Sequence, residues 1–150
     1  STDPIEVEIE MTGIEKAIRI AVEAHAGQTD KNGEPYILHV LRVMHAAVGD
    51  DAKIAAVLHD VIEDTEWSAE RLLAEGFEPR IVDAVLSVTK RDGESYQDFV
   101  LRAKANPIGR IVKMADLADN SDPPRLSRLP AEQRERLERK YAGALAQLAE

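Results

Sequence analysis

The sequence predicts an all-α fold, a compact single-domain bundle of about seven to eight helices. Apolar residues recur at intervals of three and four along most of the chain, which is the period of an amphipathic helix. Residue types that begin and end helices separate these stretches. Residues 5–10 alternate in the manner of a strand, but no partner strand is evident. We therefore expect residues 1–12 to be an N-terminal arm or added residues and residues 13–150 to form one domain.

Four helices are expected in the N-terminal half, over about residues 12–28, 37–48, 50–65 and 68–76. The first opens on a capping box, in which Thr12 and Glu15 satisfy each other's backbone donors. Gly49 suits the end of the second helix, because glycine readily adopts the left-handed conformation found there. Asp50 or Asp51 is expected to cap the third helix, since a short carboxylate side chain can accept hydrogen bonds from the first turn.

The C-terminal half carries the same kinds of boundary residue. Serine and asparagine serve as N-caps, proline fits the first turn of a helix, and glycine follows the last turn. These signals predict helices over about residues 79–89, 95–105, 108–120 and 130–148. The boundary residues are Ser68, Gly76, Pro79, Ser95, Asn106 and Pro107, and the pair Pro123-Pro124 is expected to interrupt the chain.

The composition excludes several classes of protein. The 150 residues are 44% hydrophobic and 31% charged, which is typical of a globular domain large enough to bury a core. A net charge of −9 argues against a nucleic-acid partner, because nucleic-acid surfaces are normally basic. No apolar run reaches the ~20 residues that span a bilayer, so no membrane partner is expected. The absence of cysteine excludes a disulfide framework and a thiolate zinc site, and it fits a cytoplasmic location.

Residues 56–65, Ala-Val-Leu-His-Asp-Val-Ile-Glu-Asp-Thr, are the most informative stretch of the chain. They place one imidazole and three carboxylates at the end of an otherwise apolar helix. His59 and Glu63 are four residues apart, as are Asp60 and Asp64, so helical spacing makes each pair neighbours. Crowding like charges in this way costs a helix about 0.2–0.5 kcal/mol per pair. A divalent cation removes the conflict, because carboxylates and neutral imidazole are its ligands. The stretch therefore predicts a metal site.

Two further segments supply candidate ligands. His39 lies early in the second expected helix, and Asp116, Asp119 and Asn120 share one face of the helix over 108–120. Two histidines with carboxylates and no thiolate suit Mn²⁺, Fe²⁺ or Co²⁺, with Zn²⁺ and Mg²⁺ also possible. The alternative is a solvated acidic helix end with His39 as a structural histidine. The apolar residues that precede the acidic cluster favour the metal site.

Three segments of the chain, taken together and in order, carry a resemblance to a known family. They read Gly33-Glu-Pro-Tyr-Ile-Leu-His39, Leu58-His-Asp-Val-Ile-Glu-Asp-Thr65 and Lys113-Met-Ala-Asp-Leu-Ala-Asp-Asn120. This set resembles the HD superfamily of metal-dependent phosphohydrolases. Within that superfamily it is similar to the hydrolase domain of RelA/SpoT-type enzymes and to the small stand-alone alarmone hydrolases. The resemblance covers about residues 13–145, nearly the whole chain.

The resemblance implies an activity and a set of site residues. The family removes the 3′-pyrophosphate from guanosine tetra- or pentaphosphate, so the expected reaction converts guanosine-3′,5′-bis(diphosphate) (ppGpp) to GDP and pyrophosphate. The residues matching the ligands of one Mn²⁺ ion are His39, His59, Asp60 and Asp116. Glu63 and Asp64 match the acidic pair that orients or deprotonates the attacking water. Lys31, Asn32 and Asn120 match positions that contact the nucleotide substrate.

Two positions depart from the family pattern. Asp30 stands where the family commonly has an arginine that packs on the guanine base, and a carboxylate cannot make that cation–π contact. Val40 replaces a proline that often follows the first histidine. The change at Asp30 keeps open an HD phosphohydrolase acting on another nucleotide or on a phosphorylated cofactor. A third possibility is a nucleotide-binding regulator without turnover, against which the intact Glu63 and Asp64 argue.

Overall fold

The computed structural model describes residues 9–150, apart from the side chain of Asp64. The all-α prediction is confirmed, since the described chain folds into ten helical segments and its one β pairing is an isolated bridge between Thr29 and Pro35. The helices are α1 (Gly13–Ala24), α2 (Tyr36–Ala46), α3 (Asp50–Leu58), α4 (Val61–Asp64), α5 (Ala69–Ala74), α6 (Pro79–Ser87), α7 (Tyr96–Ala105), α8 (Pro107–Asn120), α9 (Pro123–Leu126) and α10 (Ala131–Ala149). The strand-like alternation expected over 5–10 falls mostly outside the described residues.

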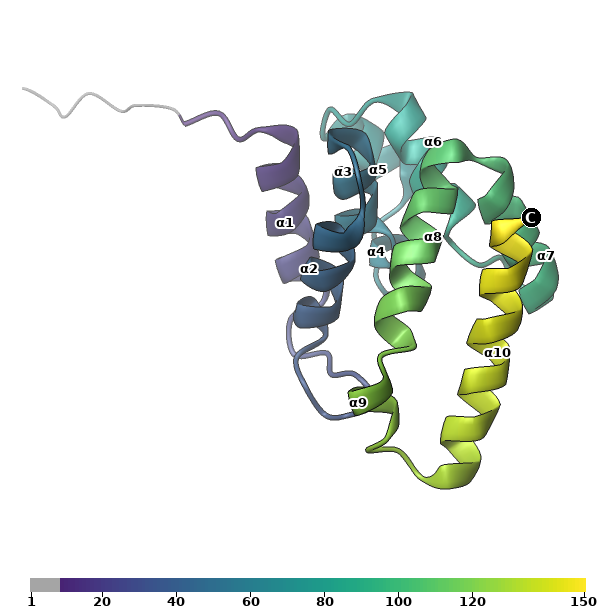
Figure 1. Cartoon of the computed structure of the whole chain (residues 1–150). Coiled ribbons are helices and arrows are strands. Elements are labelled where there is room, and N and C mark those ends of the chain that lie inside the picture. The colour runs from purple at the N-terminus through teal and green to yellow at the C-terminus, as the bar shows by residue number, and fades with distance from the viewer. Residues whose placement is uncertain (1–8) are drawn as a thin grey trace, which may run out of the picture.

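Helix α3 is the centre of the bundle. It packs against α1, α2, α6 and α8, while α10 lies against α7 and α8 at the other side of the molecule (Figure 1). The sequence explains this position, because residues 55–58 of α3 are all apolar and all fully buried. A helix that is apolar around its whole circumference must be enclosed by other helices. The C-terminal end of α3, where His59 begins, is thereby carried into the interior.

Two groups of buried side chains form the core. The larger group surrounds α3 and joins α1, α2, α6 and α8. The smaller group lies between α7, α8 and α10, and its members are Val100, Leu117, Leu126, Leu137, Tyr141, Ala144 and Leu148. Helix α8 contributes to both groups, so it is fixed from two sides. A polar residue on α8 that faces inward is consequently held in a well-defined place.

The third expected helix is interrupted at the acidic cluster, which the sequence analysis placed on one continuous helix. Helix α3 ends at Leu58, and the short α4 begins at Val61. The His59 ring donates a hydrogen bond from Nδ1 to the carbonyl oxygen of Ala56 at 2.6 Å, and Asp60 has left the helical region with φ −106° and ψ 2°. The prediction was wrong here because a side-chain hydrogen bond competes with the backbone ladder.

The helix boundaries differ from the prediction at a few other places. Pro123 and Pro124 begin the additional helix α9, because proline lacks only a backbone donor that the first turn leaves unpaired. Gly49 is the residue before α3, with φ +100°, so neither expected aspartate is the cap. The first two helices end at Ala24 rather than near 28 and at Ala46 rather than near 48. The capping box of Thr12 with Glu15 is confirmed.

A search of the described residues finds no helix with the length and hydrophobicity that a membrane crossing requires.

The loop between α6 and α7 is fixed by one ion pair that gives the fold a measurable acid sensitivity. Arg102 donates to Glu94 from Nε at 2.9 Å and from Nη2 at 3.0 Å, and these bonds lower the pKa of Glu94 from 4.5 to about 2. A folded-state pKa below the unfolded one adds stability above pH 4.5, and that stability is lost as the pH falls through about 2. Between these values the free energy of unfolding should fall more steeply in the wild type than in Glu94→Gln. Urea unfolding at each pH measures the difference, and parallel curves for the two proteins would contradict it.

Candidate metal centre

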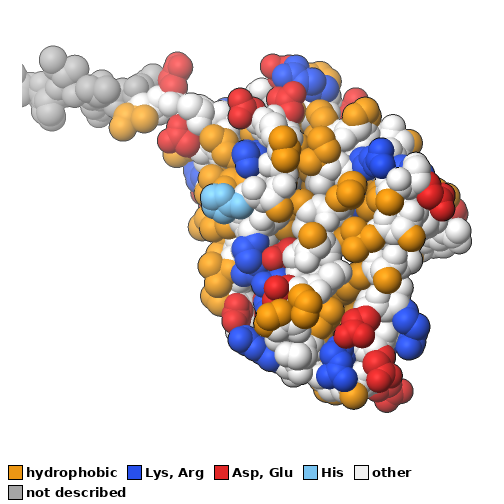
Figure 2. Space-filling view, in the orientation of Figure 1, with side chains coloured by type: hydrophobic (Ala, Val, Ile, Leu, Met, Phe, Trp, Pro, Cys, Tyr) orange, Lys and Arg blue, Asp and Glu red, His pale blue; other side chains and the backbone are white. Residues whose placement is uncertain are grey.

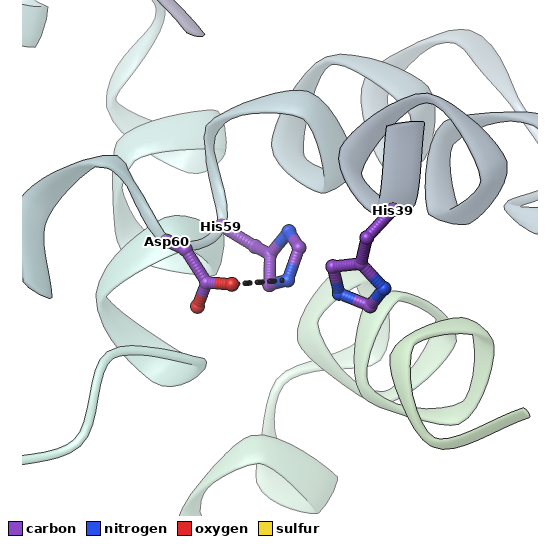
Figure 3. A group of neighbouring side chains, drawn as sticks. All are labelled: His39, His59 and Asp60. Carbon is purple, nitrogen blue, oxygen red and sulfur yellow. Dashed lines mark ion pairs between the residues drawn. The ribbon is translucent and has the colours of Figure 1, made fainter. Parts of the chain in front are cut away.

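Four of the predicted site residues lie together in the interior of the bundle. Helix α2 carries His39, the junction of α3 and α4 carries His59 and Asp60, and α8 carries Asp116. The two histidines are 4% and 2% exposed, and Asp116 is 7% exposed. Figure 3 shows the His39 ring of α2 beside the His59 ring and the Asp60 carboxylate, which both come from the junction of α3 and α4. Residues up to 77 positions apart in the sequence thus meet at one point.

Each histidine is held through Nδ1, and each directs Nε2 at the same carboxylate. His59 donates from Nδ1 to the Ala56 carbonyl, and its Nε2 lies 3.4 Å from Oδ1 of Asp116 and 3.0 Å from Oδ2 of Asp60. His39 Nε2 lies 3.0 Å from the same Asp116 oxygen. A metal-binding histidine typically has one ring nitrogen fixed by an outer partner and the other free for the ion. Both rings have this arrangement.

The donor atoms at this point fit a divalent metal ion. His39, His59 and Asp60 each offer one atom within 4.8 Å of the others, and the Asp116 carboxylate adjoins both rings. His59 Nε2 is fully buried and, among the described residues, forms no hydrogen bond. Leaving a buried polar atom unsatisfied costs about 1–3 kcal/mol. Because two imidazoles and two carboxylates are common ligands of first-row divalent ions, a metal would satisfy that nitrogen.

Electrostatics show how strongly these four groups depend on one another. Burial by itself lowers the pKa of His59, but Asp60 and Asp116 reverse this and hold it well above 6.5. Burial likewise raises the pKa of Asp116, and the contacts with the two histidines reverse it to well below the usual 3.8. The site therefore holds its carboxylates ionised in a buried place, which is the condition for binding a cation.

Tyr36 is a partner of the site whose hydrogen bond to Asp60 the sequence analysis did not predict. Its hydroxyl donates a hydrogen bond to Oδ2 of Asp60, and its ring lies 5.3 Å from the ring of His39. Tyr36 is the first residue of α2, three positions before His39, so both side chains lie on the same face of that helix. The spacing Tyr-x-x-His was therefore an available signal for this contact.

A pocket of about 290 Å³ adjoins the metal centre and is reached from solvent. Its lining includes His39 of the centre and the three predicted substrate residues, Lys31, Asn32 and Asn120. The remaining lining residues are Thr29, Asp30, Tyr36, Arg42, Asp119, Arg125, Leu126, Leu129, Leu137 and Tyr141. One wall is thus apolar and aromatic and another is charged, a combination that suits a flat base linked to an anionic group.

Asp30 has a local structural role in the loop before α2. Its Oδ1 accepts hydrogen bonds from the backbone N–H of Asn32 at 2.8 Å and of Glu34 at 3.0 Å. This pattern is an Asx-type turn, in which an aspartate side chain replaces a backbone acceptor. The carboxylate therefore shapes the loop that brings Lys31 and Asn32 to the pocket.

A cluster of five cations, close enough to one another to interact electrostatically, lies in an otherwise acidic protein. It comprises Lys31, Lys90, Lys113, Arg136 and Lys140, and we call it the cation cluster. Burial and then repulsion by the other four members lower the pKa of Lys140. The cluster reaches the metal centre through Lys113, which is 7% exposed and lies 3.3 Å from Oδ2 of Asp116. Such a concentration of positive charge favours an anionic ligand.

The two predicted acid–base residues lie on α4, three and four residues after Asp60. Glu63 is exposed, and its Oε1 accepts a hydrogen bond from the backbone N–H of Lys90 at 3.3 Å. The side chain of Asp64 lies outside the described residues. Helix α4 is closed by Thr65, whose hydroxyl donates to the Val61 carbonyl at 2.6 Å.

Comparisons with known proteins agree with this geometry. The family model described as HD domain matches residues 17–119. The chain is 36% identical over 119 residues to the guanosine-3′,5′-bis(diphosphate) 3′-pyrophosphohydrolase of Aquifex aeolicus, covering 71% of this chain and 17% of that protein. It is 32% identical over 149 residues to the probable GTP pyrophosphokinase of Mycobacterium leprae, covering 91% of this chain and 19% of that protein. The chain therefore corresponds to a small part of each relative.

A solved structure resembles the whole fold. It belongs to a protein described as a metazoan ortholog of SpoT that hydrolyzes ppGpp, and it superposes with a TM-score of 0.67 at 23% sequence identity. The match covers 94% of this chain and 98% of that chain. At this identity the likeness concerns the fold. The family model covers more than half of the chain, including His39, His59, Asp60 and Asp116, and the chain therefore belongs to the HD domain family.

Proposed function

We propose that this protein is a divalent-metal-dependent nucleotide phosphohydrolase, with ppGpp as its substrate and GDP and pyrophosphate as its products. The observation that carries the proposal is the buried His59 Nε2, which forms no hydrogen bond within the described residues although the carboxylates of Asp60 and Asp116 lie 3.0 and 3.4 Å from it. The substrate is supported by the names of the curated relatives, of which the Aquifex aeolicus protein is a 3′-pyrophosphohydrolase.

His39, His59, Asp60 and Asp116 would hold one metal ion, for which Mn²⁺ is the first choice. His39 and His59 would bind through Nε2, since the Nδ1 atoms are already engaged, and Asp60 and Asp116 would supply carboxylate oxygens. A bound divalent ion lowers the pKa of water and neutralises charge on phosphoryl oxygens. Tyr36 orients Asp60 through its hydroxyl, so it fixes a ligand without contacting substrate.

Glu63 and Asp64 would handle the proton of the attacking water. They follow the proposed ligand Asp60 by three and four residues and are carried by the same short helix. A carboxylate in this position can accept a proton from water as the bond to phosphorus forms, and it can return the proton to the leaving oxygen. The hydrogen bond from the Lys90 backbone to Glu63 links this pair to the loop that carries a member of the cation cluster.

The pocket and the cation cluster would divide the recognition of the nucleotide. The base would lie against the apolar wall formed by Leu126, Leu129 and Tyr141, with Asn32 and Asn120 supplying polar contacts. The phosphates would meet the cation cluster, where Lys113 connects the site of binding with the ligand Asp116. Such prepositioned charges hold a phosphate group in place for attack.

Asp30 favours a second candidate, an HD phosphohydrolase acting on another nucleotide or a phosphorylated cofactor. Its Oδ1 is engaged by the loop backbone, and no guanidinium is present at that position to stack on a base. A purified-protein assay with a panel of nucleotides, each with Mn²⁺ and with chelator, tests both candidates when products are identified by chromatography. Mn²⁺-dependent GDP and pyrophosphate from ppGpp support the first. Turnover of a different nucleotide and not of ppGpp would support the second candidate. Binding of a nucleotide without any turnover would favour a regulator.

Inorganic pyrophosphate is expected to stabilise the metal-free protein. It would relieve the repulsion within the cation cluster, and at a concentration of about 100 times its dissociation constant the gain is about 2.7 kcal/mol. For a domain of this size that is several degrees in the midpoint of thermal unfolding. Lys140→Gln should reduce the shift, while Arg139→Gln, which changes an exposed neighbour outside the cluster, should not. Equal shifts in the two variants would contradict the assignment of the cluster.

A further inference from the structure

Asp119 occupies a central place in the site, although neither the motif nor the ligand geometry assigns it a role. It lies on α8 one turn after Asp116, and its side chain is only 10% exposed. Its Oδ2 accepts a hydrogen bond from Nδ1 of His39 at 2.6 Å, and its Oδ1 lies 2.7 Å from Nε of Arg42 and 2.9 Å from Nη2 of Arg125. Both carboxylate oxygens are therefore engaged, and Asp119 is not available as a metal ligand.

We propose that Asp119 is a positioning residue that fixes His39 in the tautomer presenting Nε2 to the metal. The proposal rests on the metal site of the proposed function and goes beyond it, because it concerns a residue that would not touch the ion. A carboxylate can only accept, so contact with Nδ1 requires the proton to be on Nδ1. In the neutral imidazole Nε2 is then unprotonated, which is the form that binds a metal, and a metal ion would take the place beside Asp116 Oδ1 that a second proton would otherwise occupy.

His59 shows why His39 needs such a partner. The Nδ1 of His59 donates to the Ala56 carbonyl, which is part of its own helix end and therefore always present. His39 lies within α2, where the helix uses the nearby carbonyls itself, so its Nδ1 requires an acceptor from elsewhere. Asp119 supplies that acceptor from α8, 80 positions away in the sequence. The two rings thus adopt the same tautomer, His59 because of a backbone carbonyl and His39 because of the Asp119 carboxylate.

Two arginines also pair with Asp119. Arg42 comes from α2 and Arg125 from α9, so the carboxylate is approached from two sides. Burial raises the pKa of Asp119, but the hydrogen bonds of His39 and then of Arg42 outweigh it and hold the pKa well below the usual 3.8. In Figure 2, Lys or Arg side chains lie against Asp or Glu side chains between the lower ends of α2 and α8, just above α9.

Asp119→Asn separates this role from packing, because it preserves shape. The amide can present its NH₂ group to Nδ1, which places the proton of His39 on Nε2 and removes the ligand form. Loss of an outer-shell partner typically costs about 10- to 100-fold in metal affinity. Mn²⁺ binding, followed by electron paramagnetic resonance of free Mn²⁺, should weaken by about that factor.

Three control variants distinguish positioning of His39 from a structural role for the ion pairs. Arg42→Gln and Arg125→Gln each remove an ion pair of Asp119 and leave its contact with His39. Asp122→Asn makes the same chemical change at the other carboxylate that pairs with Arg125, and Asp122 has no histidine contact in the described structure. All three should bind Mn²⁺ within about threefold of the wild type. Equal loss in Arg42→Gln or Arg125→Gln would overturn the proposal.

The outcomes separate this proposal from the proposed function. If the wild-type protein binds no Mn²⁺, the metal site and this inference are both overturned. The same holds if the His59→Ala variant binds Mn²⁺ as tightly as the wild type does. Wild-type binding with no loss in Asp119→Asn would overturn the inference alone. If Asp119→Asn does not fold, long-range ¹H–¹⁵N spectra of the Zn²⁺-loaded wild type decide the matter. They should show a proton on His39 Nδ1, and coordination through Nδ1 would contradict the proposal.

Discussion

Replacing His59 with alanine is expected to abolish Mn²⁺ binding and hydrolysis together. The ring is 2% exposed, and it brings one nitrogen within 3.4 Å of Asp116 and within 3.0 Å of Asp60. Alanine removes a ligand and leaves the two carboxylates without an ion to balance their charge. The metal's stabilisation of a phosphoryl transition state is worth several kcal/mol, so the rate should fall by about 10³-fold or more. Asp60→Ala should behave in the same way.

The measurement pairs a Mn²⁺ titration with initial rates on the same preparation. Circular dichroism shows whether the helical fold is kept. His45→Ala is the matched control, because His45 is an exposed histidine in the last turn of α2 and makes no contact with the centre in the described structure. It should bind Mn²⁺ and turn over substrate as the wild type does. Full activity in folded His59→Ala would overturn the metal assignment.

Replacing Asp64 with asparagine is expected to slow hydrolysis by about 10²-fold or more while Mn²⁺ stays bound. General acid–base help contributes about 10²- to 10⁴-fold, and an amide of the same shape cannot accept the proton. The four proposed ligands are unchanged in this variant, so metal affinity should remain near the wild-type value. The loss should appear in kcat, because a group that acts only in the transition state does not alter substrate binding.

Glu66→Gln is the control for Asp64→Asn, since Glu66 is an exposed carboxylate just after α4. Its rate should equal that of the wild type. If Asp64→Asn no longer binds Mn²⁺, Asp64 would instead be assigned as a metal ligand. An unchanged rate of hydrolysis in Asp64→Asn would show that Asp64 takes no part in catalysis.

The parts of the fold that sequence could predict are those determined by local chemistry. The capping box of Thr12, the N-caps Ser68 and Ser95 and the proline at the start of α6 each act within one turn, and each is present. Helix α9 was missed because Pro123 and Pro124 were interpreted only as an interruption, although proline is compatible with a first turn.

The parts that sequence could not predict depend on contacts between distant segments. The break between α3 and α4 follows from the hydrogen bond of the His59 ring to the Ala56 carbonyl. The spacing of apolar residues along the helix does not reveal this hydrogen bond. The role of Asp119 depends on partners 77 and 80 positions away, Arg42 and His39. The four proposed metal ligands were predicted because their residue types and motif order are informative even without coordinates.

Hydrolysis of ppGpp in ¹⁸O-enriched water, with Mn²⁺ and with metal-free protein, tests most directly whether this centre activates water for attack on phosphorus. Mass spectrometry of the products should find one ¹⁸O atom in pyrophosphate and none in GDP, and only when Mn²⁺ is present. Water attacks phosphorus in this scheme, so the nucleoside oxygen leaves with GDP and keeps its original isotope. Label in GDP, or turnover by the metal-free protein at the Mn²⁺ rate, would contradict a metal-dependent phosphohydrolase built on His39, His59, Asp60 and Asp116.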